Sequence, residues 1–220
     1  MFRGCIFDLD GTLLNTLQTI AYYGNQTLAQ FHLPAIKADE YRYLVGDGAK
    51  MLIHRMLERC GISDDQLQEE VYHYYVAAYD KDPYYLTEPY AGIDMLLGCM
   101  KQHKMKLAVL SNKPHEAARH VIQRFFGEGL FDVVYGAMAG FLPKPDTRLA
   151  FQLLDELGLS ARECLYIGDT NVDMLTGRAA GMYTVGVLWG FRDRAELQHN
   201  GADRIIAEPR ELLSLCIGQA

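Results

Sequence analysis

The sequence lacks the cysteine patterns that mark two large classes of protein. Its five cysteines are scattered, odd in number and free of any Cys-x-x-Cys pair: Cys5, Cys60, Cys99, Cys164 and Cys216. This argues against a disulfide framework and against a cysteine-based zinc site. No neighbouring residues supply a base that would activate a cysteine nucleophile. We therefore expect buried thiols in a reducing compartment.

Long apolar runs and clusters of positive charge are also missing. No stretch reaches the length of a membrane span, and the apolar run before Asp8 is too short for a signal peptide. The formal net charge is −7 without any run of Lys or Arg, which argues against a nucleic-acid surface. We expect a cytoplasmic protein that binds neither membrane nor nucleic acid and acts on a small molecule.

What the sequence does contain is enough apolar material for a sizeable core, since half of its 220 residues are hydrophobic. From residue 16 to about 80 the apolar residues recur at helical spacing, and no convincing strand interrupts them. A tyrosine-rich stretch runs from residue 72 to 85, and we expect its rings to pack between helices or at an interface. Asp82-Pro83 and Glu88-Pro89 break the helical pattern and predict a linker.

From Tyr90 onward helices and short apolar runs alternate. Together with the first run, about six buried strands are predicted, at residues 5–7, 107–110, 133–135, 164–167, 183–187 and 204–206. This alternation predicts an α/β fold with a doubly wound, mostly parallel sheet and helices on both faces. The early helical block interrupts this fold directly after the first strand.

Polar residues follow three of the predicted strands. Asp8 and Asp10 come after the first, Ser111 after the second and Asp169 after a later one. Alone, an Asp-x-Asp-Gly sequence is as typical of an acidic turn as of a site, with Gly11 free to take a positive φ. Open parallel sheets bind ligands at the carboxyl ends of their strands, so the repeated placement favours one common site.

Four segments in this order resemble the motifs of the haloacid dehalogenase superfamily. They are Asp8-Leu9-Asp10-Gly11-Thr12, Ser111-Asn112, Lys144-Pro145 and Gly168-Asp169-Thr170-Asn171-Val172-Asp173. The resemblance covers essentially the whole chain. It implies a Rossmann-like catalytic core over residues 1–15 and 85–220, and an inserted all-helical cap domain over residues 16–84.

The resemblance also implies roles for the acidic residues. Asp8 is the expected nucleophile that forms an aspartyl-phosphate, and Asp10 the general acid and then the base for water. Asp8, Asp169 and the backbone carbonyl of Asp10 are the expected Mg²⁺ ligands. Thr12 and Asp173 are expected behind these ligands, although Asp173 fits equally well as a carboxylate that stabilises the start of a helix.

The same resemblance assigns the phosphate group to the other two motifs. The Ser111 hydroxyl and the Asn112 backbone amide are expected to hold phosphate oxygens, and Lys144 to neutralise the phosphoryl group and Asp8. Lys113 is expected at the surface or behind the groups that touch the substrate. Dehalogenases of the superfamily lack the second Asp, so Asp10 favours phosphoryl transfer.

Within the superfamily the chain resembles phosphoglycolate phosphatases. The shared features are the loop Val45-Gly46-Asp47-Gly48, the run Ser111 to Pro114, and the tail from Trp189 to Arg192 and on to Asp203. The family reads Lys-Pro-x-Pro where this chain has Lys144-Pro145-Asp146-Thr147, and Asp146 or Thr147 is expected to start the helix instead. Asn15 replaces an Asp that is frequent in relatives.

The substrate is then a small phosphorylated metabolite, most simply phosphoglycolate. Arg42 or Lys50 is a candidate partner for its carboxylate, and a solvent-facing position on a helix is equally compatible with each of them. A sugar phosphomutase or a pyrophosphatase on the same scaffold, and a non-catalytic binding module, remain alternatives. The sequence is compatible with a monomer or a homodimer.

Overall fold

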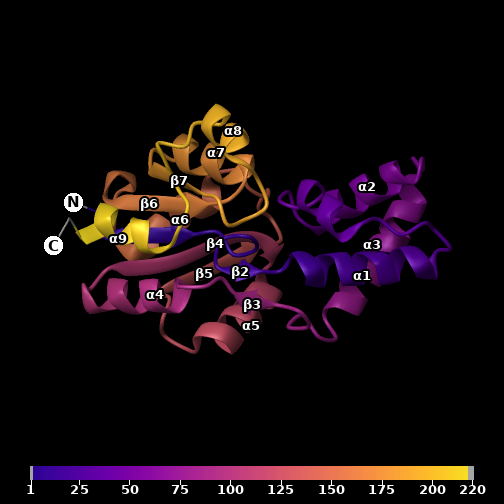
Figure 1. Cartoon of the computed structure of the whole chain (residues 1–220), viewed down its shortest axis with the longest axis horizontal. Coiled ribbons are helices and arrows are strands. Elements are labelled where there is room, and N and C mark those ends of the chain that lie inside the picture. Colours follow the sequence, from indigo (N-terminus) through magenta and orange to yellow (C-terminus); the bar gives the residue numbers. More distant parts are fainter. Residues whose placement is uncertain (1, 218–220) are drawn as a thin grey trace.

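A six-stranded parallel sheet forms the centre of the molecule. The computed structural model describes residues 2–217, and in it the strands take the order β5-β4-β1-β6-β7-β8 (Figure 1). Their bounds are β1 Gly4–Phe7, β4 Lys106–Pro114, β5 Val133–Ala137, β6 Cys164–Gly168, β7 Tyr183–Val187 and β8 Arg204–Ile206. All five pairings between neighbouring strands are parallel. The predicted α/β fold class is confirmed.

Helices cover both faces of this sheet because its strands are apolar on both sides. One face carries α4 (Ile93–Gln102), α5 (His115–Phe126) and α9 (Arg210–Ile217), whose buried residues form one cluster with Cys5 and Phe7. The other carries α6 (Arg148–Leu157), which packs against Ile6, and α7 (Asn171–Ala179), whose Gly177 abuts Tyr166. The remaining short elements of this part are η2 (Ala161–Glu163) and α8 (Arg194–His199).

The segment expected to form the cap, residues 16–84, holds α1 (Leu17–Gln30), η1 (Ala38–Tyr43), α2 (Ala49–Arg59) and α3 (Asp65–Tyr79). These helices lie together beside the sheet, on the right in Figure 1. They bury a hydrophobic cluster of their own, which is separate from the two clusters on the sheet faces. Among the described residues, Phe191 is its one member from outside the segment. We call residues 16–84 the cap and the rest the core; the positions of the boundaries remain a prediction.

The connection between cap and core differs from the expected linker. β2 (Leu14–Asn15) and β3 (Glu88–Pro89) pair in antiparallel fashion, so the chain leaves and re-enters the core through a two-stranded ribbon. Glu88-Pro89 was a poor strand candidate from sequence because proline donates no backbone hydrogen bond. A two-residue pairing at a sheet edge tolerates it.

The end of β4 also differs from the prediction, which placed the strand end before Ser111. The strand continues to Pro114, which pairs with Ala137 after a register shift that begins at Leu110. Residues 111–113 therefore lie on an irregular strand end, where bulges redirect side chains.

At the start of α6, Asp146 accepts a hydrogen bond from the Arg148 backbone N–H (3.0 Å), whereas Thr147 makes no side-chain cap. Asp146 thus supports the start of the helix as expected. Gly158 ends this helix in the left-handed conformation, also as expected. Among residues 2–217, no helix combines the length and apolar character that crossing a bilayer requires.

Two helix glycines provide a matched test of this packing. A Cβ at Gly24 in α1 would come within 2.5 Å of the Tyr41 hydroxyl oxygen, whereas a Cβ at Gly98 in α4 would meet no atom within 4 Å. We expect Gly24→Ala to lower the free energy of unfolding by about 1–3 kcal/mol through overpacking. Gly98→Ala should raise it by about 0.5–1 kcal/mol through lower chain entropy. Urea denaturation of both variants measures these changes, and equal effects of the two would contradict the packing described.

Candidate active site

The three adjacent central strands bring the predicted polar residues together. β4, β1 and β6 are neighbours in the sheet and all run in the same direction, so their carboxyl ends meet at one edge. Asp8 and Asp10 follow β1, Ser111 lies at the end of β4, and Asp169 follows β6. The expectation that these residues share one region is therefore met by the structure. The roles assigned to them are chemical and remain predictions.

A buried lysine joins two of the acidic residues. Lys144 donates hydrogen bonds from Nζ to Asp8 Oδ1 (2.8 Å) and to Asp173 Oδ1 (2.7 Å). The Lys144 side chain is only 4% exposed, so its charge depends on these partners. Burial lowers the pKa of Lys144, but the charges of Asp173 and Asp8 outweigh this and hold the pKa well above its usual value. The lysine is a permanent cation beside Asp8.

Asp173 is the helix-start carboxylate that the sequence allowed, and it also bonds to Lys144; its expected place behind a metal ligand remains a prediction. Its Oδ2 accepts hydrogen bonds from the Thr170 backbone N–H (3.0 Å) and hydroxyl (2.7 Å), which form a capping box at the start of α7. Its Oδ1 binds Lys144. The helix start thus fixes the carboxylate that, in turn, holds the lysine in place.

Asp169 is held from two sides. Thr12 donates its hydroxyl hydrogen to Asp169 Oδ1 (3.0 Å). The Phe191 backbone N–H donates to Oδ2 (2.8 Å). A Cβ at Gly190 would collide with Asp169 and with the Gly11 carbonyl oxygen, so glycine allows this close approach of the two loops.

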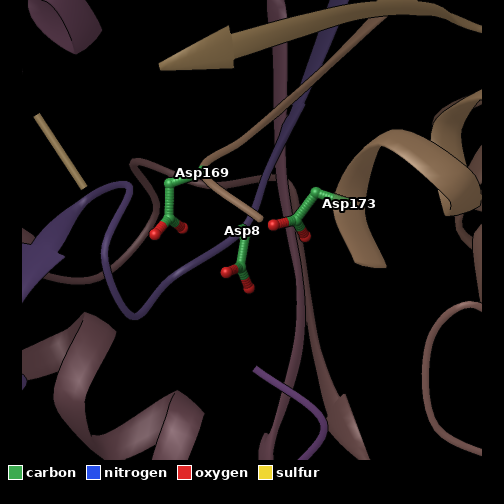
Figure 2. Close-up of side chains that lie close together, drawn as sticks. All are labelled: Asp8, Asp169 and Asp173. Carbon is green, nitrogen blue, oxygen red and sulfur yellow. The ribbon is translucent and has the colours of Figure 1, made fainter. Parts of the chain in front are cut away.

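Three carboxylates converge here, and Lys144 bonds to two of them. Asp8, Asp169 and Asp173 each offer an oxygen within 4.8 Å of those of the other two. Figure 2 shows these three side chains close together. Burial, followed by the charges of Asp173 and Asp8, raises the pKa of Asp169 well above its usual value. Burial also raises the pKa of Asp8 to about 7, with Lys144 opposing and Asp173 reinforcing the shift. An excess of buried negative charge on oxygen donors is the environment that fits a hard divalent cation such as Mg²⁺.

Asp10 faces a second buried lysine. Lys113 Nζ donates to both carboxylate oxygens of Asp10 (3.2 and 3.3 Å) and to the Tyr79 hydroxyl oxygen (2.8 Å). Of the two positions expected for Lys113, the surface is wrong: the residue is only 8% exposed and contacts Asp10. Burial lowers its pKa, but Asp10 and Tyr79 outweigh burial and raise the pKa above its usual value.

Ser111 and Asn112 lie at the same end of β4. The Ser111 hydroxyl accepts a hydrogen bond from the Lys113 backbone N–H (3.2 Å) and lines the cavity beside Asp8. The Asn112 side chain accepts from the Lys144 backbone N–H (2.7 Å) and donates to the carbonyl oxygens of Lys144 and Gly46 (3.2 and 3.0 Å). Asn112 therefore fixes the loop that carries Lys144, a function that the sequence did not indicate. Phosphate binding by these two residues remains a prediction.

A cavity separates these groups from the cap. Its core side contains Asp8, Asp10, Ser111 and Lys113, and its cap side is mostly apolar. The apolar lining consists of Ile20, Val45, Ala49, Leu52, Tyr75 and Val76 from the cap, joined by Phe191.

Neither candidate partner for a substrate carboxylate is among the residues that line this cavity. The Lys50 side chain is 64% exposed and pairs with Glu69 (3.3 Å), which is the solvent-facing alternative. Arg42 is half-buried, and its Nε has no hydrogen-bond partner among residues 2–217. Asp47, in the loop of residues 45–48, pairs with Arg55 within the cap (2.6 Å).

The loop after β7 contributes residues that the sequence indicated only as a feature shared with relatives. Trp189 Nε1 donates to the Thr12 carbonyl oxygen (2.9 Å), and Phe191 holds Asp169 while its ring packs into the hydrophobic cluster of the cap. Arg192 Nη2 donates to the Val45 carbonyl oxygen (2.9 Å). The aromatic and glycine residues at 189–192 could have indicated that this loop contacts both the core and the cap, but the sequence alone did not show which residues they contact.

Comparison with known proteins identifies the family of the chain. A family model described as haloacid dehalogenase-like hydrolase matches residues 5–187. The chain belongs to this family. A phosphoglycolate phosphatase of Aquifex aeolicus is 30% identical over 213 residues, covering 97% of this chain and 96% of that protein. One of Rhodospirillum rubrum is 32% identical over 199 residues, covering 87% and 81%.

A solved structure gives the same result for the fold. A haloacid dehalogenase-like family hydrolase of Streptococcus pneumoniae superposes with a TM-score of 0.85 at 25% identity, and the match covers 97% of this chain and 98% of that one. The resemblance deduced from the four motifs is thus confirmed, together with its phosphoglycolate phosphatase-like character.

The raised pKa of Asp8 predicts a pH-dependent stability. The folded, metal-free protein binds the Asp8 proton more tightly than the unfolded chain, whose Asp pKa is near 3.8, so the contribution of Asp8 to stability falls as pH rises from about 4 to about 7. Without metal, we expect Asp8→Asn to raise the melting temperature at pH 8 by roughly 2–4 °C, and by less at pH 4.5. Mg²⁺ should stabilise the wild type at pH 8 more than the variant. Calorimetry in EDTA and in Mg²⁺ measures both, and a destabilised variant at pH 8 in EDTA would contradict the charge balance described.

Proposed function

We propose that the protein is a Mg²⁺-dependent phosphatase that hydrolyses a small phosphate monoester through an aspartyl-phosphate. The observation that carries this proposal is the position of Asp8. Its carboxylate lines the cavity, bonds to the permanent cation Lys144, and lies among oxygen donors for a divalent cation. A carboxylate in such a setting is a competent nucleophile toward phosphorus.

In the first step Asp8 attacks phosphorus and the bond from phosphorus to the ester oxygen breaks. Asp10, two residues along and also lining the cavity, gives the departing oxygen its proton. In the second step water attacks the phosphorus of the aspartyl-phosphate, Asp10 takes a proton from that water, and inorganic phosphate leaves with Asp8 regenerated. Each proton that Asp10 donates is thereby recovered.

The remaining groups hold charge and position. Lys144 stabilises the negative charge on the transferring phosphoryl group, aided by the Ser111 hydroxyl and the Asn112 backbone amide. Mg²⁺ held by Asp8, Asp169 and the backbone carbonyl of Asp10 would neutralise further phosphate charge. Asp173 and Thr12 keep Lys144 and Asp169 in place through the hydrogen bonds given above.

Phosphoglycolate is the substrate that we propose, and the curated relatives of that name are the main support. A second support comes from the cap side of the cavity. Gly48 and Ala49, at the start of α2, line the cavity, and this helix start has no side-chain cap. Its free backbone N–H groups suit a carboxylate. The start of α2 therefore replaces Lys50 as the proposed partner of the substrate carboxylate, because the Lys50 side chain points to solvent.

The reaction is tested with purified protein, Mg²⁺ and p-nitrophenyl phosphate. We expect turnover that EDTA abolishes and Mg²⁺ restores, and an activity loss of at least about a thousandfold in Asp8→Asn, since no other group replaces a nucleophile. Asp155→Asn, an exposed carboxylate on α6, is the matched control and should retain full activity. Activity that survives EDTA or Asp8→Asn would refute the mechanism.

The substrate is tested with a panel of alkyl phosphates that includes phosphoglycolate, glycerol phosphate and hexose phosphates. We expect the highest kcat/KM for phosphoglycolate, because the helix start at Gly48 meets its carboxylate. Inorganic phosphate and the alcohol should appear in equal amounts. A preference for a hexose phosphate would overturn the substrate assignment, and an isomerised sugar phosphate without free phosphate would indicate a mutase.

A further inference from the structure

The contact between Lys113, Asp10 and Tyr79 joins the cap to the proposed proton donor. Lys113 comes from β4, Asp10 from the loop after β1, and Tyr79 is the last residue of α3 in the cap. The ammonium donates to both oxygens of Asp10 and to the Tyr79 hydroxyl, and it lies 4.6 Å from the centre of the Tyr79 ring. No other hydrogen bond between described side chains connects the cap to Asp10, so this is a single chain of contacts.

Lys113 has one partner in the core, Asp10, and one in the cap, Tyr79. Asp10 belongs to the core, as Lys113 does, so their contact does not pass through the cap. Tyr79 reaches Lys113 only while the cap is in place, as it is here, where Asn112 bonds to Gly46 and Arg192 to Val45. With Tyr79 absent, Lys113 would lose a hydrogen bond and a ring contact and would regain the rotamer freedom of an exposed lysine.

We propose that Tyr79 and Lys113 are positioning residues that fix the Asp10 carboxyl group in its reactive orientation when the cap covers the site. The inference rests on the proposed function, in which Asp10 protonates the departing oxygen. Proton transfer depends strongly on the distance and direction of the donor, so a few tenths of an ångström of freedom at Asp10 lowers its rate. As a result, Asp10 donates its proton efficiently only when the cap covers the cavity and keeps water out, because only then does Tyr79 contact Lys113.

Leaving-group chemistry separates this role from a merely structural one. A p-nitrophenolate leaves as a stable anion and has little need of a proton donor, whereas the alkoxide of an alkyl phosphate needs one. The quantity to measure is kcat/KM, which reports on the steps up to departure of the leaving group, for phosphoglycolate and for p-nitrophenyl phosphate. A loss of folding or of cap packing lowers both values alike, and a loss of Asp10 positioning lowers the alkyl value selectively.

Tyr79→Phe is the main variant, because it keeps the ring and removes only the hydroxyl. We expect kcat/KM to fall about tenfold for phosphoglycolate and less than about twofold for p-nitrophenyl phosphate. Lys113→Met should give the same selectivity with a larger fall, about a hundredfold for the alkyl substrate. Tyr23→Phe is the matched control. Tyr23 is equally buried, packs against the Tyr79 ring (5.3 Å) and spends its hydroxyl on the Asp82 carbonyl oxygen, so both values should stay near wild type.

Asp10→Asn distinguishes the two possible failures. If Asp10→Asn shows no selective loss with the alkyl substrate, the acid role of Asp10 in the proposed function is wrong. If Asp10→Asn is selective but Tyr79→Phe and Lys113→Met lower both substrates equally, or neither, the positioning role proposed here is overturned. A selective loss in Tyr23→Phe as large as in Tyr79→Phe would also overturn it, because the effect would then come from cap packing.

Discussion

The bond of Lys144 to both Asp8 and Asp173 is the interaction on which the rest of the site depends. Removing an ammonium and carboxylates from water is costly, and a buried pair repays that cost only with near-ideal geometry. Here two of the three members are held by other groups: Asp173 by the first turn of α7, and the Lys144 backbone by the Asn112 side chain. The fold therefore constrains a charge arrangement that would not assemble by itself.

One lysine against three carboxylates leaves the arrangement short of positive charge. This shortage favours the binding of a divalent cation, and without one burial, reinforced by the charge of Asp173, raises the pKa of Asp8 to about 7. The geometry of the sheet explains why the site lies at the carboxyl ends of β4, β1 and β6. Only adjacent parallel strands deliver several loop residues to one edge of a sheet at close range.

Several contacts between the cap and the site are made by core loops that also hold a site residue. Phe191 binds Asp169 through its backbone and enters the cap cluster with its ring, and Asn112 supports Lys144 and bonds to Gly46. Lys113 joins Asp10 to Tyr79 in the same manner. Because the cap has a hydrophobic cluster of its own, it is stabilised internally.

The sequence by itself determined the fold class, the family and the set of residues at the strand ends. Apolar periodicity is a local property of the chain, so it predicts helices and strands directly. Residues that follow successive parallel strands meet at one edge of the sheet, so the order of the motifs predicts a common site. The sequence did not determine the pairing of β2 with β3, the continuation of β4 to Pro114, or the burial of Lys113, which spacing alone left undecided between the surface and the site. Each of these depends on a partner far along the chain. The contact of Lys113 with Asp10 joins residues 103 positions apart, and only the tertiary structure could show that a lysine at the end of one strand satisfies its charge on an acid at the end of the next.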